Sequence, residues 1–398
     1  MLVENGLEPA SDNPIKKIIH ISGSGSLHGG AEHCLLELVE YELSVGLECT
    51  VVAPAEGDFT LAAADMGAKS IVLPFSPWTK ASTDGGLILA AKTICKLLRN
   101  CIAECALLLI LKREQPSLVH INTSAVCTGN FSAKRLRIPV VWHVRELLNP
   151  VSGREFYNRN RQIEIIRSSE AVIAVSKAAA DALGSGVGFD TLFTIYEFVP
   201  SPRRQPRSLF SSKSLKIGLI GNLNPAKGQF DCFLALRSLK ARNISFQVIV
   251  AGDCSYEAYY SKITSFLNDN DLNQSVKFIG YVDNPYTVLQ KCDICLNCSF
   301  SESFGRVTVE GLLAGCLVIG RDTSGTTELL SNNRGLLFSN SQALSDKLEW
   351  VFKNPAEAQK IALRGSDYAW NSFSNKENSI NQILSVFAKA SVERQTRE

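Results

Sequence analysis

The feature that most constrains the fold is a regular alternation of short apolar runs with amphipathic stretches, which occurs twice along the chain. In the first half, runs of β-branched and aliphatic residues begin near positions 16, 48, 70, 118, 140 and 171. In the second half, such runs begin near positions 215, 246, 276, 293 and 316. Strands that alternate with helices form βα units around a parallel sheet. The sequence therefore predicts an α/β protein with two separate parallel sheets.

The two series are separated by a proline-, serine- and arginine-rich segment, which is typical of a linker. A chain of 398 residues is also longer than one hydrophobic core usually serves. We expect a first domain over 14–200, a linker over 201–213, a second domain over 214–375 and a last helical segment over 376–398. Helical periodicity predicts helices that include 31–44, 87–113, 155–168, 341–353 and 376–390.

Charge and composition exclude several classes of protein. The formal net charge of +2 gives no general attraction to nucleic acid. The first residues are acidic and polar, unlike a signal peptide, and the apolar run from Cys101 to Leu111 spans only about half of a membrane helix. That run is typical of a buried helix face. We interpret the 12 cysteines as small core residues rather than disulfide partners, and expect a cytoplasmic protein.

A glycine-rich loop follows the first predicted strand and precedes a helix. Gly23, Gly25, Gly29 and Gly30 allow a ligand to approach the backbone, and the helix offers free N–H groups to an anion such as phosphate. A dinucleotide-binding fingerprint would require glycine where His28 stands. A turn with a purely geometric role is the alternative.

Lys227 lies in a short loop between a strand and a helix at the start of the second series. The ammonium group and the positive end of a helix dipole would act together at this point. A diphosphate leaving group would be stabilised there. A solvated surface lysine is the alternative interpretation.

The most informative segment contains Glu302 and Glu310, eight residues apart, around Phe304, Gly305 and a predicted helix. Helical rise would separate the two carboxylates by roughly 12 Å, whereas a retaining glycosidase pair lies about 5 to 5.5 Å apart. The glutamates could instead bind the two ends of an extended ligand. An exposed position is the alternative for Glu310, but the apolar residues around it favour a buried carboxylate with a partner.

His143 closes a predicted strand, and ligands of open α/β sheets bind at the carboxyl ends of strands. We expect its imidazole to hydrogen-bond a sugar hydroxyl in the cleft, with a structural histidine as the alternative.

Two other patterns resemble metal-binding motifs, but we interpret neither as a metal site. Cys292, Cys295 and Cys298 are regularly spaced, but they fall on a predicted buried strand whose side chains alternate in direction. Asp269 and Asp271 form a D-x-D pair in a polar stretch that predicts a surface turn.

Taken together, these segments resemble the family-4 retaining glycosyltransferases of the GT-B fold, from about Ile18 to Ala388. The resemblance implies two Rossmann-like domains that face each other across a cleft, with the last helix packed back on the first domain. Its matching segments are HGGAE at 28–32, the strand-end His143, AVSKAAAD at 174–181, GNLNPAKG at 221–228, VKFIGYV at 276–282, the two glutamates with S-F-G between them, and GTTEL at 325–329.

The resemblance also implies roles for single residues. The second domain would hold a nucleotide-sugar donor, with Lys227 at the diphosphate, Glu310 at the ribose and Glu302 at the transferred sugar. His143 would contact the donor sugar near the reacting centre, which makes His143, Lys227 and Glu302 the implied catalytic set. The remaining donor contacts would come from Gly29, Gly30, Asn222, Phe304, Gly305, Arg306 and Val307.

Two departures from the family pattern stand out. Asn222 replaces a common arginine, so either Arg306 or a first-domain arginine such as Arg145 compensates for the missing charge, or donor binding is weaker. Glu197 and Phe198 occupy a region where relatives often have an asparagine-glycine turn.

The implied reaction is metal-independent transfer from a UDP- or GDP-sugar, with retention of configuration, to a saccharide or lipid-linked acceptor. Cell-surface polysaccharide or glycoconjugate synthesis is the expected setting. The basic group Arg154, Arg159, Arg161 and Arg167 is a candidate for peripheral contact with the inner face of a membrane, although a solvated helix face is the simpler interpretation.

Three rival functions remain. A nicotinamide-dependent oxidoreductase would leave the segment from Glu302 to Glu310 unexplained. A phosphorylase with a cofactor lysine would need a much longer chain. A non-catalytic scaffold that binds nucleotide sugars without turnover is the main alternative.

Overall fold

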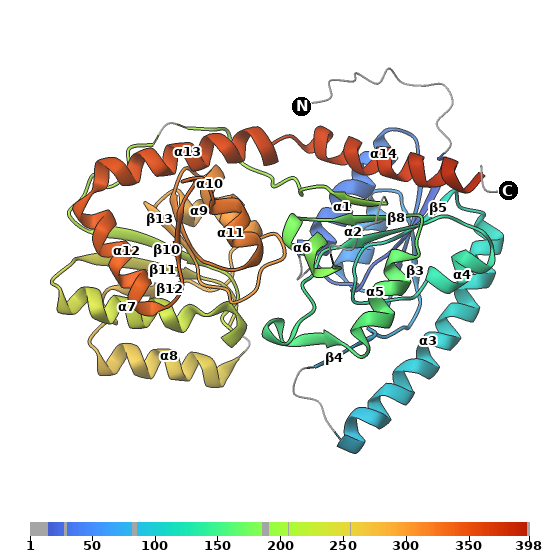
Figure 1. Cartoon of the computed structure of the whole chain (residues 1–398), viewed down its shortest axis with the longest axis horizontal. Coiled ribbons are helices and arrows are strands. Elements are labelled where there is room, and N and C mark those ends of the chain that lie inside the picture. Colours follow the sequence, from blue (N-terminus) through green and yellow to red (C-terminus); the bar gives the residue numbers. More distant parts are fainter. Residues whose placement is uncertain are drawn as a thin grey trace.

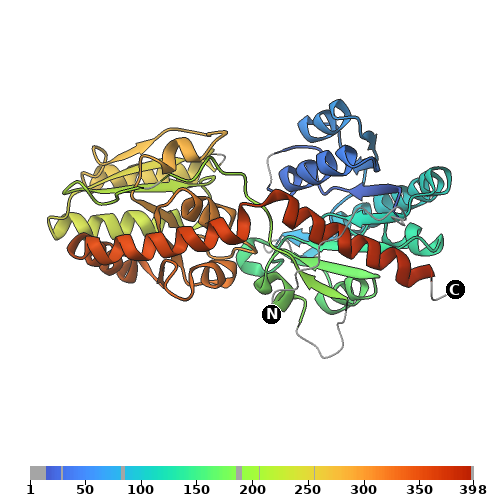
Figure 2. The same ribbon diagram turned by 90° about the horizontal axis from the view of Figure 1, so that it is seen from above.

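The computed structural model describes residues 15–27, 30–81, 86–184, 191–205, 207–254 and 256–395. Two domains lie side by side, and each is built on one parallel sheet (Figures 1 and 2). The predicted α/β fold with two separate sheets is confirmed.

The N-terminal domain contains a seven-stranded sheet in the order β3-β2-β1-β5-β6-β8-β9. All of its strands are parallel, and the strand order reverses between β1 and β5. The strands are β1 Lys17–Ile21, β2 Glu48–Ala53, β3 Lys69–Val72, β5 Leu118–Ile121, β6 Val140–Val144, β8 Ala171–Ala174 and β9 Leu192–Thr194.

Helices cover both faces of this sheet because its side chains are apolar on both sides. One face packs against α1 Gly30–Ser44, α2 Asp58–Asp65 and α14 Lys376–Gln395. The other face packs against α3 Gly86–Glu114, α4 Asn130–Arg135, α5 Arg159–Arg167 and α6 Lys177–Ala182.

The C-terminal domain contains a six-stranded parallel sheet in the order β12-β11-β10-β13-β14-β15, which reverses between β10 and β13. Its strands are β10 Leu215–Ile220, β11 Phe246–Ala251, β12 Val276–Phe278, β13 Ile294–Asn297, β14 Leu317–Arg321 and β15 Leu336–Phe338. Its helices are α7 Gln229–Ala241, α8 Glu257–Asp269, α9 Tyr286–Leu289, α10 Arg306–Leu313, α11 Ser324–Leu330, α12 Ser341–Lys353 and α13 Pro355–Phe373.

The predicted helix over 155–168 is shorter than expected. Arg154–Phe156 forms the strand β7, which pairs antiparallel with β4 Thr79–Ala81. Helix α5 begins only after Asn158, whose side chain caps it by accepting a hydrogen bond from the Arg161 amide at 3.2 Å. Local helical periodicity was outweighed here by pairing with a distant segment and by a capping residue.

The chain returns to the N-terminal domain through two consecutive helices. In Figure 1, α13 lies along the C-terminal domain and α14 continues over the N-terminal domain. Ile383, Val386 and Phe387 of α14 are buried in the apolar core between α1 and the sheet. Burial of this face fixes the C-terminal end of the chain on the first domain.

Two of the recognised motifs meet at the domain interface. Glu328 of the GTTEL segment accepts hydrogen bonds from the Lys177 and Ala178 amides at 3.2 and 3.1 Å. It also accepts the Tyr196 hydroxyl. A carboxylate of the second domain therefore occupies the N-terminal end of α6 in the first, where the backbone amides have no helical partner.

The predicted linker is attached to the C-terminal domain chiefly by Arg207, beside a hydrogen bond from the Leu209 amide to Gln359 at 2.7 Å and an ion pair of Arg204 with Asp367. Arg207 donates hydrogen bonds to the carbonyl groups of Leu289, Gln290, Cys292 and Ala314, at 2.7 to 3.2 Å. These carbonyl groups lie where helices and loops end, so they have no partner within a helix.

We expect Arg207→Ala to lower the free energy of unfolding by about 2–3 kcal/mol, because several carbonyl groups lose a charged donor at once. Urea unfolding followed by tryptophan fluorescence measures this change. Arg203→Ala is the matched control, since Arg203 is an exposed linker residue. Equal stability of the two variants would contradict a fixing role for Arg207.

Candidate active site

A cleft of about 470 Å³ lies between the two domains, at the carboxyl ends of their sheets. On the N-terminal side it is lined by residues that follow β1 and β5, the strands between which the strand order reverses. On the C-terminal side it is lined by the loop that follows β13, which is also next to such a reversal. Ligands of open α/β sheets bind at this type of position.

The C-terminal wall of the cleft is the start of helix α10. Gly305 precedes the helix with a φ of 89°, a backbone conformation that favours glycine. Phe304, Gly305 and Arg306 all line the cleft, and so do Glu302 and Ser303 just before them. The N-terminal end of α10 therefore presents backbone amides and a positive dipole to this space.

Lys227 is brought to the same wall by a tight turn after β10. Its Nζ lies 2.7 Å from Oε1 of Glu302, in a partly exposed ion pair. Gly228 follows with a φ of 63°, and a Cβ atom there would lie 2.2 Å from the Cys298 carbonyl oxygen. Only glycine fits this close approach, which sets the loop after β10 against the loop after β13.

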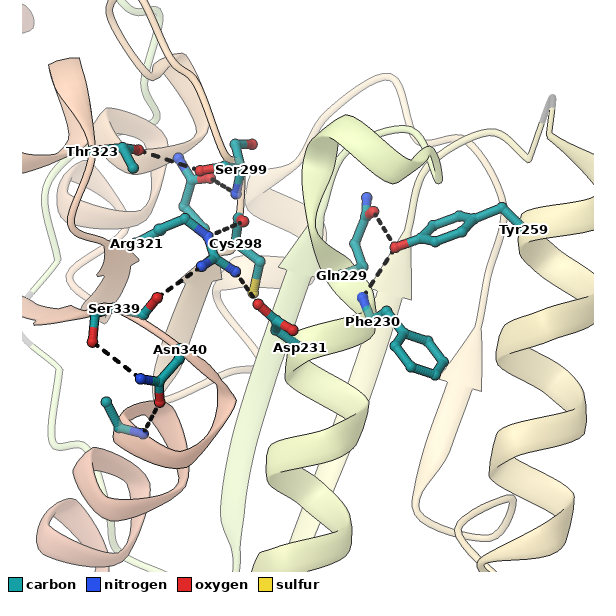
Figure 3. A network of polar contacts seen from close by, with 12 residues as sticks. Gln229, Phe230, Asp231, Tyr259, Cys298, Ser299, Arg321, Thr323, Ser339 and Asn340 are labelled. Atoms are coloured by element: carbon teal, nitrogen blue, oxygen red, sulfur yellow. Dashed lines mark hydrogen bonds and ion pairs between the residues drawn. The ribbon is translucent and has the colours of Figure 1, made fainter. Parts of the chain in front are cut away.

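The loop after β13 is fixed from behind by Arg321, at the end of β14 (Figure 3). This buried side chain donates to the Cys298 carbonyl at 2.9 Å and to the Ser339 carbonyl at 3.1 Å, and it pairs with Asp231 of α7. Its guanidinium also stacks 4.2 Å from the centre of the Phe300 ring. Arg321 thus connects the carboxyl ends of β13, β14 and β15, beneath the loop that leads to Glu302.

Glu310 lies one turn into α10 and is buried, with 8% of its surface exposed. Arg306 Nε is 3.3 Å from its Oε1, and the same arginine reaches Cys34 of the N-terminal domain at 3.2 Å. Burial raises the pKa of the Glu310 carboxyl to about 7, although Arg306 opposes this shift. The second glutamate of the motif is therefore held near the cleft by the arginine that lines it.

The N-terminal wall is dominated by Arg145, the first residue after β6. Its Nε donates to Asn122 Oδ1 at 2.8 Å, and its Nη1 pairs with Glu197. Glu32 and Glu146 also line the cleft on this side. Burial raises the pKa of the Glu32 carboxyl above its usual range, and the nearby Glu146 adds to that shift.

The comparisons with known proteins agree with this geometry. Residues 201–367 match the family described as glycosyl transferases group 1, and residues 28–201 match glycosyltransferase family 4. The two matches together span both domains. The chain belongs to the family-4 glycosyltransferases.

Among sequence relatives, an uncharacterized 42.6 kDa protein in the cps region of Klebsiella pneumoniae is 27% identical over 76% of this chain and 83% of its own length. A Campylobacter jejuni N-acetylgalactosaminyltransferase, named for a diphospho-undecaprenol-linked acceptor, is 23% identical over 36% of this chain and 41% of its own. Among solved structures, Anabaena HepE in complex with UDP covers 94% of this chain and 99% of its own, with a TM-score of 0.75 and 21% identity.

The structure brings most of the predicted donor residues of this glycosyltransferase to one place. Gly30, Glu302, Phe304, Gly305 and Arg306 line the cleft. Lys227 and Glu310 do not line it themselves but are each paired with a residue that does. Gly29 lies outside the described residues.

Asn222 and Val307 do not line the cleft. The Asn222 side chain accepts a hydrogen bond from the Asp253 amide at 3.1 Å, which holds two strand-end loops together. Val307 is in the first turn of α10, partly buried against the core.

His143 does not line the cleft. Its side chain is buried, at 1% exposure, and it borders a small cavity that includes Leu38 of α1 and Ile383 of α14. Side chains alternate along β6, so His143 points to the face covered by these helices. Arg145, two residues further on, borders the same cavity with its Nη2 3.4 Å from His143 Nδ1, and it lies beyond the end of the strand, where it also lines the cleft.

One group of described residues has the composition of a metal site. His20, Glu42 and Cys49 offer ligand atoms within 4.8 Å of one another beneath α1. Hydrogen bonds account for this arrangement, because Glu42 Oε2 lies 2.8 Å from His20 Nε2 and 3.2 Å from Cys49 Sγ. The group lies on the face of β1 opposite to the core that includes α3, away from the cleft residues.

The raised pKa of Glu310 predicts a pH-dependent stability. Between about pH 4.5 and 7 the folded protein keeps a proton on Glu310 that the unfolded chain releases, so the free energy of unfolding falls as the pH rises and levels off above about pH 7. We expect wild type to lose up to about 3 kcal/mol relative to Glu310→Gln across this range. Urea unfolding at several pH values measures the difference, and parallel profiles for the two proteins would contradict it.

Proposed function

We propose that this glycosyltransferase moves a sugar from a nucleotide-diphosphate sugar, a UDP- or GDP-sugar, to an acceptor hydroxyl with retention of configuration and without a metal. The observation that carries the proposal is the arrangement around one cleft of the α10 amides, Arg306 and the Lys227–Glu302 pair, opposite Arg145. These groups suit a ligand with a negatively charged centre and a hydroxyl-rich end.

The donor would lie with its diphosphate between the N-terminal end of α10 and Lys227. The amides, the helix dipole and two cationic side chains would stabilise the negative charge that develops on the departing diphosphate. Glu302 would accept hydrogen bonds from the sugar, and Glu310 from the ribose. The crystal structures of Anabaena HepE with UDP and with UDP-glucose support a uridine nucleotide as the first candidate.

In the transfer step, the bond between the anomeric carbon and the diphosphate oxygen breaks, and a bond from that carbon to the acceptor oxygen forms on the same face. The acceptor proton passes to the departing diphosphate, so the protein supplies position and charge rather than a nucleophile. We assign to Arg145 the contact near the reacting centre that the sequence assigned to His143. Asn222 adds no charge here, and Arg306 and Arg145 compensate for it.

The acceptor is proposed to be a saccharide or a lipid-linked saccharide, in the synthesis of a cell-surface polysaccharide or glycoconjugate. The Campylobacter relative is named for an acceptor of the second type, and the Klebsiella relative for a cps region. A scaffold protein that binds the donor without turnover is the alternative.

Calorimetric titration with UDP, GDP and ADP in the presence of EDTA tests the donor site. We expect one nucleotide to bind, and Lys227→Ala to weaken its binding about tenfold to a hundredfold, because a charged hydrogen bond to phosphate is lost. Lys347→Ala is the matched control, since Lys347 is exposed on α12 away from the cleft. Absence of binding, or binding only when a divalent cation replaces EDTA, would overturn the metal-independent donor site.

The released sugar reports the stereochemistry and separates the enzyme from a scaffold. With an α-linked UDP-sugar and water as acceptor, we expect slow release of UDP and of the α anomer of the sugar. Proton NMR detects that anomer before mutarotation. The β anomer as first product would contradict retention, and nucleotide binding with no release to any acceptor would favour the scaffold.

A further inference from the structure

Helix α3 carries an apolar face that nothing in the described structure covers. Ile94, Leu98, Ile102 and Leu109 are 59%, 61%, 71% and 68% exposed. We call these four residues the outer stripe. In Figure 1 the N-terminal half of α3 extends beyond the rest of its domain. Solvent-exposed apolar patches of this kind mark interaction surfaces.

The outer stripe follows one side of the helix. At 100° per residue its members fall within an arc of roughly 80°, and from Ile94 to Leu109 it runs about 22 Å along the axis. Ala103, Leu107 and Leu111, on the opposite side, are buried against the sheet. The sequence predicted a buried helix face for this apolar run, and the structure shows a second apolar face that is left without a partner among the described residues.

The exposed charged side chains of α3 between residues 89 and 112 are all positive. Lys112 lies in line with the outer stripe, whereas Arg99 and Lys92 lie about 60° and 80° beyond its edge around the helix. The acid in the middle of the helix, Glu104, is turned toward α4, where it accepts hydrogen bonds from the Gly129 and Ser132 amides at 2.8 and 2.9 Å. The outer stripe is therefore flanked by positive charge, which suits an anionic surface.

A second copy of the chain fits less well. Two outer stripes packed against each other would bring like charges from both helices together. A bilayer-spanning role is also excluded for α3 as described, since none of the described helices is long and apolar enough to cross a membrane. An apolar helix face with basic flanks suits the interface of an anionic bilayer.

An apolar groove lies beside the outer stripe. It has a volume of about 660 Å³ and is lined by Leu97 and Cys101 of α3, by Trp78 and by Arg161 of α5. Pro77 borders both this groove and the cleft between the domains. The groove and the cleft therefore share one bordering residue on the N-terminal domain.

We propose that the outer stripe of α3 and its basic flanks dock this protein on an anionic lipid bilayer. The arginine group suggested by the sequence is not the main contact, because Arg159 and Arg167 are already bonded to the Leu148 and Gly184 carbonyls. The docking does not depend on the proposed transfer reaction.

Co-sedimentation with large unilamellar vesicles, without nucleotide, tests the proposal. Vesicles of phosphatidylcholine with about one third phosphatidylglycerol are compared with vesicles of phosphatidylcholine alone. We expect binding to the anionic vesicles, reduced at least about tenfold in Ile94→Ser/Leu98→Ser/Ile102→Ser and reduced similarly in Lys92→Gln/Arg99→Gln/Lys112→Gln. Raised salt should weaken it.

Leu61→Ser/Leu363→Ser is the matched control, since these leucines are exposed at 54% and 47% on α2 and α13. Its vesicle binding should equal that of wild type, and circular dichroism should show all variants folded. Nucleotide titration of the same variants should be unchanged, which separates docking from the donor site. Equal binding by wild type and the stripe variant, or a wild-type dimer that the stripe variant loses in analytical ultracentrifugation, would overturn the proposal.

Discussion

The position of every functional group in this protein depends on the geometry of parallel sheets. In each domain all strands of the main sheet end at one edge, and the loops that leave that edge diverge where the strand order reverses. Placed edge to edge, the two sheets make a cleft whose walls are loops and the ends of helices. Glycines such as Gly228 and Gly305 are needed there because the loops pack too closely, or turn too sharply, for a side chain.

Three cations at or beside the cleft are paired with carboxylates. Lys227 pairs with Glu302, Arg306 with Glu310 and Arg145 with Glu197. A diphosphate that binds here would exchange partners with these pairs rather than meet free cations. These ion pairs hold long side chains in place, so less conformational entropy is lost when a ligand binds. The net electrostatic attraction between the cations and the ligand is smaller, because the ligand must displace the carboxylates.

The domain interface and the cleft share residues. Ser303, which lines the cleft, accepts the Ser176 hydroxyl at its carbonyl, and Glu328 holds the start of α6. Helix α14 adds a second connection by packing on the first sheet. Because the same short segment lines the cleft and contacts the other domain, a change in the angle between the domains would also change the site. The outer stripe lies on the first domain alone, so attachment to a surface would leave the second domain free of that constraint.

The sequence by itself determined the fold class, most strand positions and the segments that form the C-terminal wall of the cleft. Alternating apolar runs and glycine-bounded loops are local signals, and they singled out Lys227, Glu302 and the start of α10, which the structure brings next to one another. The tertiary structure decided which side chains face the cleft. His143 lies one residue inside β6, is buried and contacts Arg145, whereas Arg145 lies just beyond the end of the strand and lines the cleft. Strand length and packing, rather than composition, set this difference. Tertiary structure also decided strand β7, which forms by pairing with the distant strand β4. In α3 the apolar run predicted one buried face, and only the structure shows a second apolar face that is exposed.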